Sequence, residues 1–100
     1  MFLKTILVIF ILNVQVGIAK EIEEYKSELI RIGILDQKIR TEYTYWDDRI
    51  RTDKENLETL KSLIKRHGFP TISLVGERAH TYAFLVAQHG TSDLNFMIYF

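Results

Sequence analysis

The 100-residue sequence has no cysteine, a single proline and no excess of charge of either sign. Without cysteine, the chain forms neither a disulfide scaffold nor a thiol nucleophile. It also cannot be a bacterial lipoprotein, because a lipoprotein needs a cysteine at its cleavage site. The 13 basic and 13 acidic residues are interspersed along the chain. Since a nucleic-acid-binding protein normally carries a basic stripe, we expect no nucleic-acid partner.

Residues 1–19 have the pattern of a secretory signal peptide. A short, positively charged start precedes the mostly apolar residues 5–19, and the small residues Gly17 and Ala19 occupy the two positions that a signal peptidase reads. We therefore expect cleavage before Lys20 and export of the protein to the periplasm or the medium. The alternative is an uncleaved segment that anchors the chain to the inner membrane, although its apolar run is shorter than the roughly 20 residues of a spanning helix.

Apolar residues after residue 20 recur at intervals of three, four and seven, which is the helical period. This pattern predicts a helix over about 21–45, with a bend at Gly33 because glycine weakens a helix interior. The run 41–46 is rich in β-branched and aromatic residues, so a strand remains an alternative there. The periodic positions are Ile22, Tyr25, Leu29, Ile32, Ile39, Tyr43, Trp46 and Ile50. The aromatic residues expected in the core, rather than in a ligand site, are Tyr43, Tyr45, Trp46 and Phe69.

A second helix is expected to begin at Thr52. Thr52 and Glu55 have the spacing of a capping box, in which each side chain accepts a hydrogen bond from the backbone N–H of the other residue. Residues 46–51 would then be a connection or a frayed end. Gly68 predicts the end of this helix, because glycine readily adopts a positive φ, and Pro70 follows it. The apolar stripe of the helix is Leu57, Leu60, Leu63 and Ile64.

A third helix is expected to open at Gly76, after an extended segment 69–75, with Ser73 as its cap. Apolar residues then recur at i, i+3, i+4, i+7 and i+8, which is the pattern of a core-facing helix. Several of them are alanines, which predicts a close approach to a neighbouring helix. They are Ala79, Tyr82, Ala83, Val86 and Ala87.

The last helix is expected to follow Ser92 as its cap. Residues 95–100 are mostly apolar, and the chain stops there without a polar or capping residue. We therefore expect a partial or truncated gene product whose exposed apolar end leads to self-association or to instability.

The three histidines do not have the spacing of a metal site. His80 and His89 are nine residues apart, which places them half a turn out of phase on a straight helix. His67 belongs to another segment. The sequence also lacks a Gly-x-Ser-x-Gly nucleophile motif and a glycine-rich phosphate-binding loop. We expect no metal and no cofactor.

The candidate catalytic residues are Asp36, Arg40, Gln88 and His89. Asp36 and Arg40 are four apart and can pair on one helix face. Arg40 can either brace the fold or bind an anion. His89 can either be a C-terminal residue favoured by the helix dipole or act as a general acid or base, because histidine titrates near neutral pH. An enzyme site would require Arg40 and His89 to converge.

The sequence resembles the bacterial domain-of-unknown-function family 6624. Residues 67–77, HGFPTISLVGE, are similar to its His/Tyr-Gly-Trp-Pro and Ser-Leu-Val-Gly stretches, and Gln88-His89 is similar to the Gln-His that follows its alanine-rich helix. The resemblance covers about residues 22–100. The upstream strings that resemble its motifs are Asp36-Gln37-x-x-Arg40 and Asp53-x-x-Asn56-x-x-x-Leu60.

Two departures from the family pattern matter. Phe69 stands where the family usually has tryptophan. Family members also continue through another helix and a Tyr-Gly-Thr-Gln-like segment, which is absent here. If that segment contributes to a site, this chain cannot hold the whole site.

These patterns predict an all-α domain of about four helical segments over residues 20–100, the last one cut short, behind the signal peptide 1–19. The resemblance implies a mostly helical, often exported domain with no assigned activity. We expect a protein that binds a partner or a small polar ligand. The alternative is a hydrolase or transferase acting on a polar substrate, with a site completed by the missing C-terminal segment. A membrane would be a partner through an uncleaved signal alone.

Overall fold

The computed structural model describes residues 2–42, 45–91, 94–98 and 100, and for residues 2–12 and 94 it describes the backbone alone. Within these ranges the chain forms helices and no strand, so the predicted all-α fold is confirmed. The helices are α1 (Phe2–Thr41), α2 (Trp46–His67), α3 (Ile72–Gly90) and α4 (Leu94–Met97).

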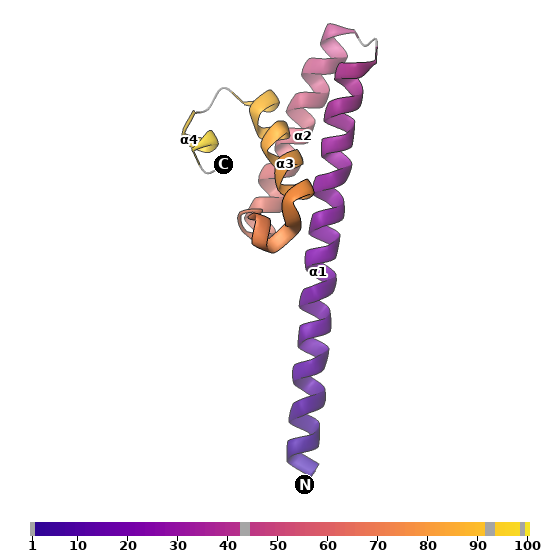
Figure 1. Cartoon of the computed structure of the whole chain (residues 1–100), viewed down its shortest axis with the longest axis vertical. Helices are drawn as coiled ribbons and strands as arrows, with labels where there is room; N and C mark the ends of the chain where they lie inside the picture. The colour runs from indigo at the N-terminus through magenta and orange to yellow at the C-terminus, as the bar shows by residue number, and fades with distance from the viewer. Residues whose placement is uncertain (1, 43–44, 92–93, 99) are drawn as a thin grey trace.

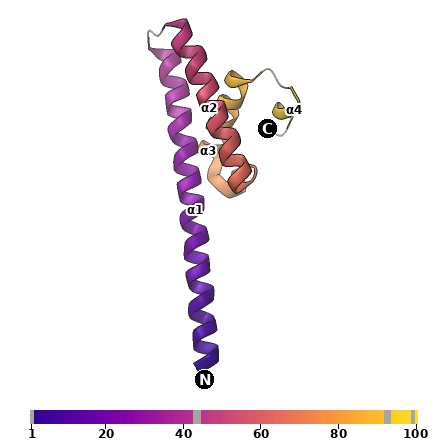
Figure 2. The ribbon, with the colours of Figure 1, turned by 180° about the vertical axis from the view of Figure 1, so that it is seen from behind.

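Helices α1 and α2 form an antiparallel hairpin, and α3 packs against both of them (Figure 1). Figure 2 shows the same arrangement from behind. The molecule extends 65 Å along its longest axis, close to the roughly 60 Å that a helix as long as α1 reaches at 1.5 Å per residue. The first part of α1 therefore projects beyond the bundle, and the side chains of residues 13–20 are all exposed.

The core lies where large side chains of α1 meet small side chains of α3. Tyr25, Leu29 and Ile32 of α1 have no exposed surface, and neither do the alanines of α3. Small side chains let two helix axes approach closely. The predicted apolar stripes are thus largely confirmed. The buried apolar residues are Tyr25, Leu29, Ile32 and Ile39 of α1, Leu57, Leu60 and Leu63 of α2, and Val75, Ala79, Ala83, Val86 and Ala87 of α3.

Helix α1 differs from the predicted helix over 21–45 because it begins much earlier, ends at Thr41 and runs through Gly33 without interruption. Gly33 allows α3 to pack closely against α1, and it does not bend the helix. A Cβ atom at this position would overlap the ring of Tyr82 on α3. Glycine in a helix interior lowers stability by about 1 kcal/mol, and here the close packing of the Tyr82 ring offsets that loss.

The predicted start of α2 at Thr52 is wrong, and so is its capping box. The helix begins at Trp46, after an extended Tyr45 whose side chain makes no capping hydrogen bond. Asp47 and Asp48 lie in the first turn, where the positive end of the helix dipole favours carboxylates. These two carboxylates, and not a capping hydrogen bond, favour the start of α2 at this point, and Thr52 lies inside the helix.

The end of α2 agrees with the sequence prediction. Gly68 follows the last helical residue with a φ of 88°, and its N–H donates to the carbonyl oxygen of Ile64 at 2.8 Å. Side chains other than glycine rarely adopt a positive φ, because their Cβ atom clashes with the backbone.

The predicted extended segment is wrong in its second half, because residues 72–75 form a helical turn. Thr71, and not Ser73, caps this turn by accepting a hydrogen bond from the N–H of Leu74 at 3.2 Å. Gly76 then interrupts the helix with a φ of 85°, and α3 continues beyond this kink. The glycine that was expected to open the helix lies within it.

The apolar end of the chain packs on the bundle to a large extent. Phe96, Met97 and Phe100 are partly buried against the core, and the ring centroids of Phe100 and Phe69 lie 4.9 Å apart. The expected exposure holds for Ile98, which is 77% exposed. The expected cap Ser92 lies outside the described residues.

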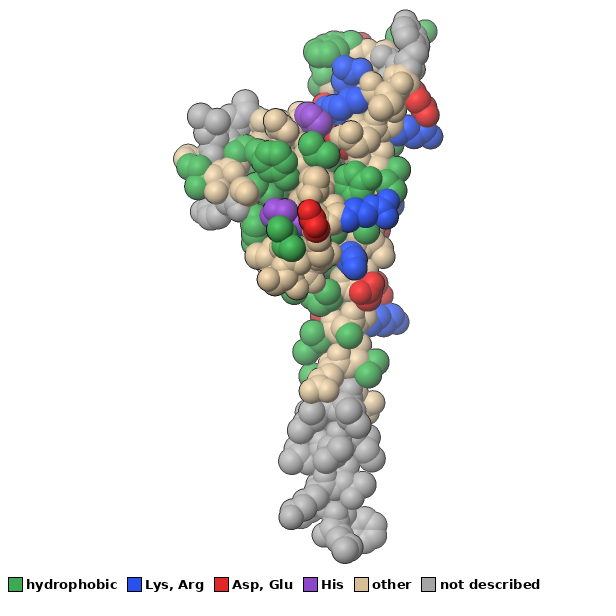
Figure 3. Space-filling model, in the orientation of Figure 1, with side chains coloured by type: hydrophobic (Ala, Val, Ile, Leu, Met, Phe, Trp, Pro, Cys, Tyr) green, Lys and Arg blue, Asp and Glu red, His purple; other side chains and the backbone are tan. Residues whose placement is uncertain are grey.

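The aromatic residues at the tip of the α1–α2 hairpin were wrongly expected in the core. Tyr45 is 72% exposed and Trp46 is 67% exposed, because this tip extends beyond α3 (Figure 1). Tyr43, and the middle of the possible strand 41–46, lie outside the described residues. Figure 3 shows the molecule in the orientation of Figure 1. Hydrophobic side chains gather on the side where α3 lies, and charged side chains lie along the edge formed by α1.

No helix within the described part of the chain is long and apolar enough to span a membrane.

Candidate functional site

Three of the four candidate residues, Asp36, Arg40 and His89, meet at the carboxylate of Asp36, in the second half of α1. Its side chain is 1% exposed. Arg40, one turn further along α1, donates from Nη1 to Oδ1 of Asp36 at 3.1 Å, which confirms the predicted pair. Gln37 donates from Nε2 to Oδ2 at 2.8 Å. Hydrogen bonds of this kind compensate for the burial of a charge.

His89 brings the end of α3 to the same carboxylate. Its Nδ1 atom lies 2.9 Å from each oxygen of Asp36. Because a carboxylate has no proton to donate, Nδ1 must carry the hydrogen, so Nε2 is the acceptor nitrogen whenever the ring is neutral. An aspartate that orients a histidine in this way is the arrangement found behind many general bases.

Arg40 also links the cluster to α2. Its Nη2 atom lies 2.8 Å from both carboxylate oxygens of Asp53 on α2. The guanidinium is therefore held between two carboxylates, and its side chain is 22% exposed. This geometry favours the bracing interpretation of Arg40, because an anion would have to displace Asp53. Asp36, Arg40, Asp53 and His89 are called the charge cluster below.

Close packing between α3 and α2 allows the charge cluster to form. A Cβ atom on Gly90 would lie 2.7 Å from Cβ of Leu57 and 2.9 Å from the backbone oxygen of Asp53. The absence of a side chain at Gly90 thus lets the end of α3 approach α2 beside the cluster. The neighbouring buried Asn56 donates to the carbonyl oxygen of Ile32 at 3.2 Å and gives α1 and α2 a second link.

Two of these residues were not among the sequence candidates. Asp53 and Asn56 are three apart, which places both side chains on one face of α2. Their Asp-x-x-Asn spacing belongs to the strings that resemble the family, and it is the signal in the sequence that points to them. Gln88 was a candidate, but it is exposed and lies about 100° around α3 from His89. The structure therefore separates it from the cluster.

The remaining histidine of α3 has a structural contact. Nδ1 of His80 lies 2.7 Å from the carbonyl oxygen of Pro70, so it links α3 to the segment before it. Across the described residues, no group of three or more histidine, aspartate or glutamate side chains could hold a metal ion.

Comparison with known proteins identifies no relative. No protein-family model, curated protein or solved structure matches this chain. The resemblance to family 6624 therefore stays a prediction carried by its motifs, and the function has to be inferred from side-chain geometry.

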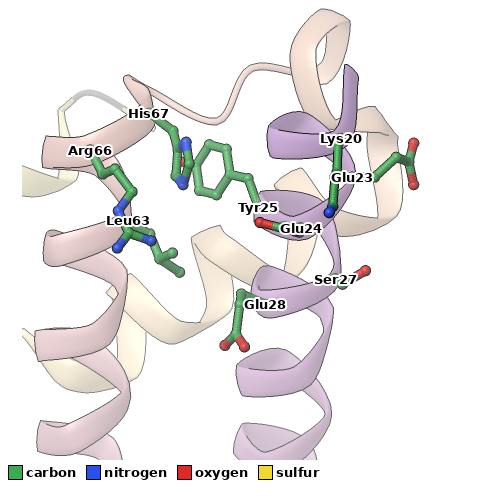
Figure 4. Close-up of a pocket in the computed structure, with 9 residues that line it drawn as sticks. All are labelled: Lys20, Glu23, Glu24, Tyr25, Ser27, Glu28, Leu63, Arg66 and His67. Atoms are coloured by element: carbon green, nitrogen blue, oxygen red, sulfur yellow. The ribbon is translucent and has the colours of Figure 1, made fainter. Parts of the chain in front are cut away.

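A pocket of about 500 Å³ lies away from the charge cluster, between α1 and the C-terminal end of α2 (Figure 4). This volume is within the range of small-molecule sites. No member of the charge cluster lines the pocket, since Asp36 lies about 12 Å along α1 from Glu28 at the helical rise. The pocket is called the α1–α2 groove below. Its lining residues are Lys20, Glu23, Glu24, Tyr25, Ser27, Glu28, Leu63, Arg66 and His67.

A ring stack joins the two walls of the groove. The ring centroids of Tyr25 and His67 lie 4.6 Å apart, at an interplanar angle of 23°. The hydroxyl of Tyr25 donates to the carbonyl oxygen of Gly68 at 2.9 Å. Burial raises the pKa of Tyr25 to about 12, because the interior disfavours the phenolate. The phenol therefore stays a neutral donor at neutral pH and keeps the end of α2 against α1.

The walls of the groove carry charges of both signs, and Lys20 stands on the α1 wall beside Glu24. Glu24 and Glu28 of α1 point into the gap, whereas Glu23 points away from α2 (Figure 4). Arg66 and His67 stand on the opposite wall. Among the described residues, Lys20, Glu24 and Arg66 form no ion pair, whereas Glu28 pairs with Arg31 at 2.8 Å. None of the four candidate residues lines this groove.

Proposed function

We propose that this chain is an exported helical domain that binds a small polar ligand in the α1–α2 groove. The observation that carries the proposal is the set of unpaired charges, Lys20, Glu24 and Arg66, gathered around the Tyr25–His67 stack in a concave site. Charges in a cleft with low-dielectric walls act more strongly on a ligand than charges on an open surface. A ligand with complementary charge gains from them without breaking an internal ion pair.

The way α1 joins the bundle supports the export part of the proposal. The side chains of residues 13–20 are exposed, and Tyr25 is the first fully buried residue among the side chains that the structure describes. Cleavage before Lys20 would leave the groove and the buried core in place. The new first turn would contain Glu21, Glu23 and Glu24, and the positive end of the helix dipole favours acidic residues there. Retention of an anchor, the alternative, would also preserve the groove.

The test is a screen of the 100-residue chain against small polar molecules by thermal shift, with hits measured by calorimetry. We expect Glu24→Gln or Arg66→Gln to weaken binding about tenfold or more, because hydrogen bonds to charged groups contribute about 1.5–3 kcal/mol. Glu21→Gln and Lys65→Gln are matched controls, since both residues are exposed neighbours outside the groove. Binding that neither groove substitution weakens, or no binding by any compound, would reject the proposal.

The convergence of Arg40 and His89 on Asp36 supports a second candidate function, a hydrolase or transferase acting on a polar substrate. In this proposal Nε2 of His89 accepts a proton from water or a substrate hydroxyl, while Asp36 orients the ring. The assay is turnover of simple carboxylic and phosphoric esters. His89→Gln should abolish turnover, and His80→Gln should preserve it. Absent turnover, or equal activity of both variants, would reject the enzyme.

A further inference from the structure

We infer that removal of the signal peptide completes the α1–α2 groove by creating a charged amino terminus at Lys20, and that the processed groove binds a small oxyanion, a carboxylate or a phosphate. The inference rests on the proposed function, since it names the ligand class and the regulation of the same groove. It comes from the place of Lys20 in both the cleavage site and the groove, and from the charges that face the gap.

Lys20 belongs to the cleavage site and to the groove at once. The small residues Gly17 and Ala19 predict cleavage directly before Lys20. Among the side chains that the structure describes, Lys20 is also the first along the chain to line the groove, and none of residues 13–19 lines it. Cleavage therefore removes no described lining residue and leaves the new chain terminus at the groove itself.

The new terminus adds a positive charge to the groove. In the uncleaved chain the backbone nitrogen of Lys20 is an uncharged amide within α1. After cleavage the same atom, one bond of about 1.46 Å from the Cα atom, becomes an amino group. An α-amino group has an ordinary pKa of roughly 7.7–8.0, so most of it is protonated at neutral pH. Lys20 then carries one positive charge on its terminus and another on its side chain.

The carboxylates of the α1 wall do not cancel both of these charges. Glu28 pairs with Arg31, with oxygen and nitrogen 2.8 Å apart, and Glu23 points away from α2 (Figure 4). Glu24 remains, one helical turn after Lys20 on the same wall. A single carboxylate there balances one of the two positive charges of Lys20, and the other is left for a ligand.

The α2 wall adds positive charge on the other side of the gap. Arg66 stands in the last turn of α2, and it forms no ion pair within the described part of the chain. The C-terminal end of a helix carries the equivalent of about half a negative charge, which is less than the full charge of the guanidinium. Guanidinium N–H groups match the paired oxygens of a carboxylate or a phosphate. The processed groove therefore favours an oxyanion over a cation.

The contact between Tyr25 and His67 holds the two walls of the groove together. Their ring centroids lie 4.6 Å apart, and the hydroxyl of Tyr25 donates to the carbonyl oxygen of Gly68 at 2.9 Å. Both interactions join α1 to the end of α2, and both involve residues that follow the cleavage site. The groove is thus shaped before processing, and the feature that processing changes is its charge.

The test is calorimetry of three forms of the protein with succinate and with inorganic phosphate. The forms are the 100-residue chain, the processed chain recovered from the exported fraction, and residues 20–100 with an acetylated amino terminus. The acetylated form is the matched control, because it has the length of the processed chain and lacks the terminal charge. We expect the processed chain to bind at least one of the two anions about fivefold more tightly than either other form.

Two substitutions in the processed chain test the roles of the walls. Arg66→Gln should weaken binding of the anion about tenfold, because it removes a charged hydrogen-bond donor. Glu24→Gln should not weaken binding, because the charge that it removes is negative. Lys65→Gln is the control for Arg66→Gln and should keep the affinity, since Lys65 is an exposed neighbour outside the groove.

The outcomes separate the inference from the proposed function. Equal affinity of the processed and acetylated forms overturns the inference, and so does binding of another polar ligand but of neither anion. An exported chain that keeps residues 1–19, or a processed chain that circular dichroism shows to be unfolded, overturns it as well. In each case the proposed function survives if Glu24→Gln or Arg66→Gln weakens a ligand of the 100-residue chain. If no polar compound binds, or if neither substitution affects any ligand, the proposed function fails together with the inference.

Discussion

Asp36 and His89 are 53 residues apart in the sequence, yet Nδ1 of His89 lies 2.9 Å from both carboxylate oxygens of Asp36. This contact ties the end of α3 to α1, and Arg40 links the same carboxylate to Asp53 of α2. One charge cluster therefore joins all three helices of the bundle. Two carboxylates face one guanidinium, so the cluster carries one net negative charge when the imidazole is neutral.

Removal of the central carboxylate should destabilise the fold strongly. We expect Asp36→Ala to lower the free energy of unfolding by about 3–5 kcal/mol, because breaking a buried pair leaves its partners uncompensated. Urea unfolding followed by circular dichroism measures the change. The matched control is Asp48→Ala, whose 44% exposed side chain pairs with Arg51 at the surface, and it should cost less than about 1 kcal/mol. Equal effects of the two substitutions would show that the cluster is energetically unimportant.

The close approach of α3 to α2 makes a second prediction. We expect Gly90→Ala to lower the free energy of unfolding by about 1–3 kcal/mol, because the added Cβ would lie 2.7 Å from Cβ of Leu57 and force a shift. Gly17→Ala is the control, since an added Cβ there has no described atom within 4 Å. Thermal unfolding of the two variants gives the comparison. A neutral or stabilising effect of Gly90→Ala would mean that the helix ends are not in tight contact.

Burial of Tyr25 predicts a loss of stability at high pH. Its pKa is raised to about 12 in the folded chain, against about 10 in the unfolded chain. The stabilising term is complete below pH 10. It is lost as the pH rises from 10 to 12, because the unfolded state then binds fewer protons than the folded state. Unfolding by urea across this pH range measures it.

The comparison variant for this effect is Tyr25→Phe. It should lose about 1 kcal/mol at neutral pH, because it lacks the hydrogen bond to Gly68, and its stability should fall less steeply above pH 10. If the two proteins lost stability in parallel above pH 10, the alkaline effect would have to come from other groups.

The helices could be predicted from the sequence wherever the buried residues recur at the helical interval of about 3.6 residues. Leu29 and Ala83 are buried because the 3.6-residue repeat of the sequence matches the repeat of the helix. The start of α2 could not be found from a capping motif, because Asp47 and Asp48 act on the helix dipole without any capping hydrogen bond. The role of Gly33 depends on Tyr82 of another helix, which no local pattern contains.

The candidate site, like the fold, could be predicted where its contacts are local and not where they depend on the packing of different helices. The pair of Asp36 and Arg40 is local, so its four-residue spacing predicts it. The contact with His89 depends on the packing of α3 and follows from no spacing. The α1–α2 groove was missed for a similar reason. Glu24 and Arg66 lie on different helices, and each looks like an ordinary surface charge within its own segment.

The export proposal predicts where the mature chain begins. We expect the full-length gene product, made in a bacterium, to appear in the exported fraction with Lys20 as its first residue, as measured by N-terminal sequencing. Ala19→Arg should block cleavage, because the peptidase requires a small residue at this position, and should leave uncleaved chain with the membranes. Glu21→Gln is the control and should be cleaved normally. The processed chain should remain folded, because the buried core begins at Tyr25. An uncleaved wild-type chain in the membrane fraction would instead establish the anchored alternative, with the bundle held at the membrane by the projecting end of α1.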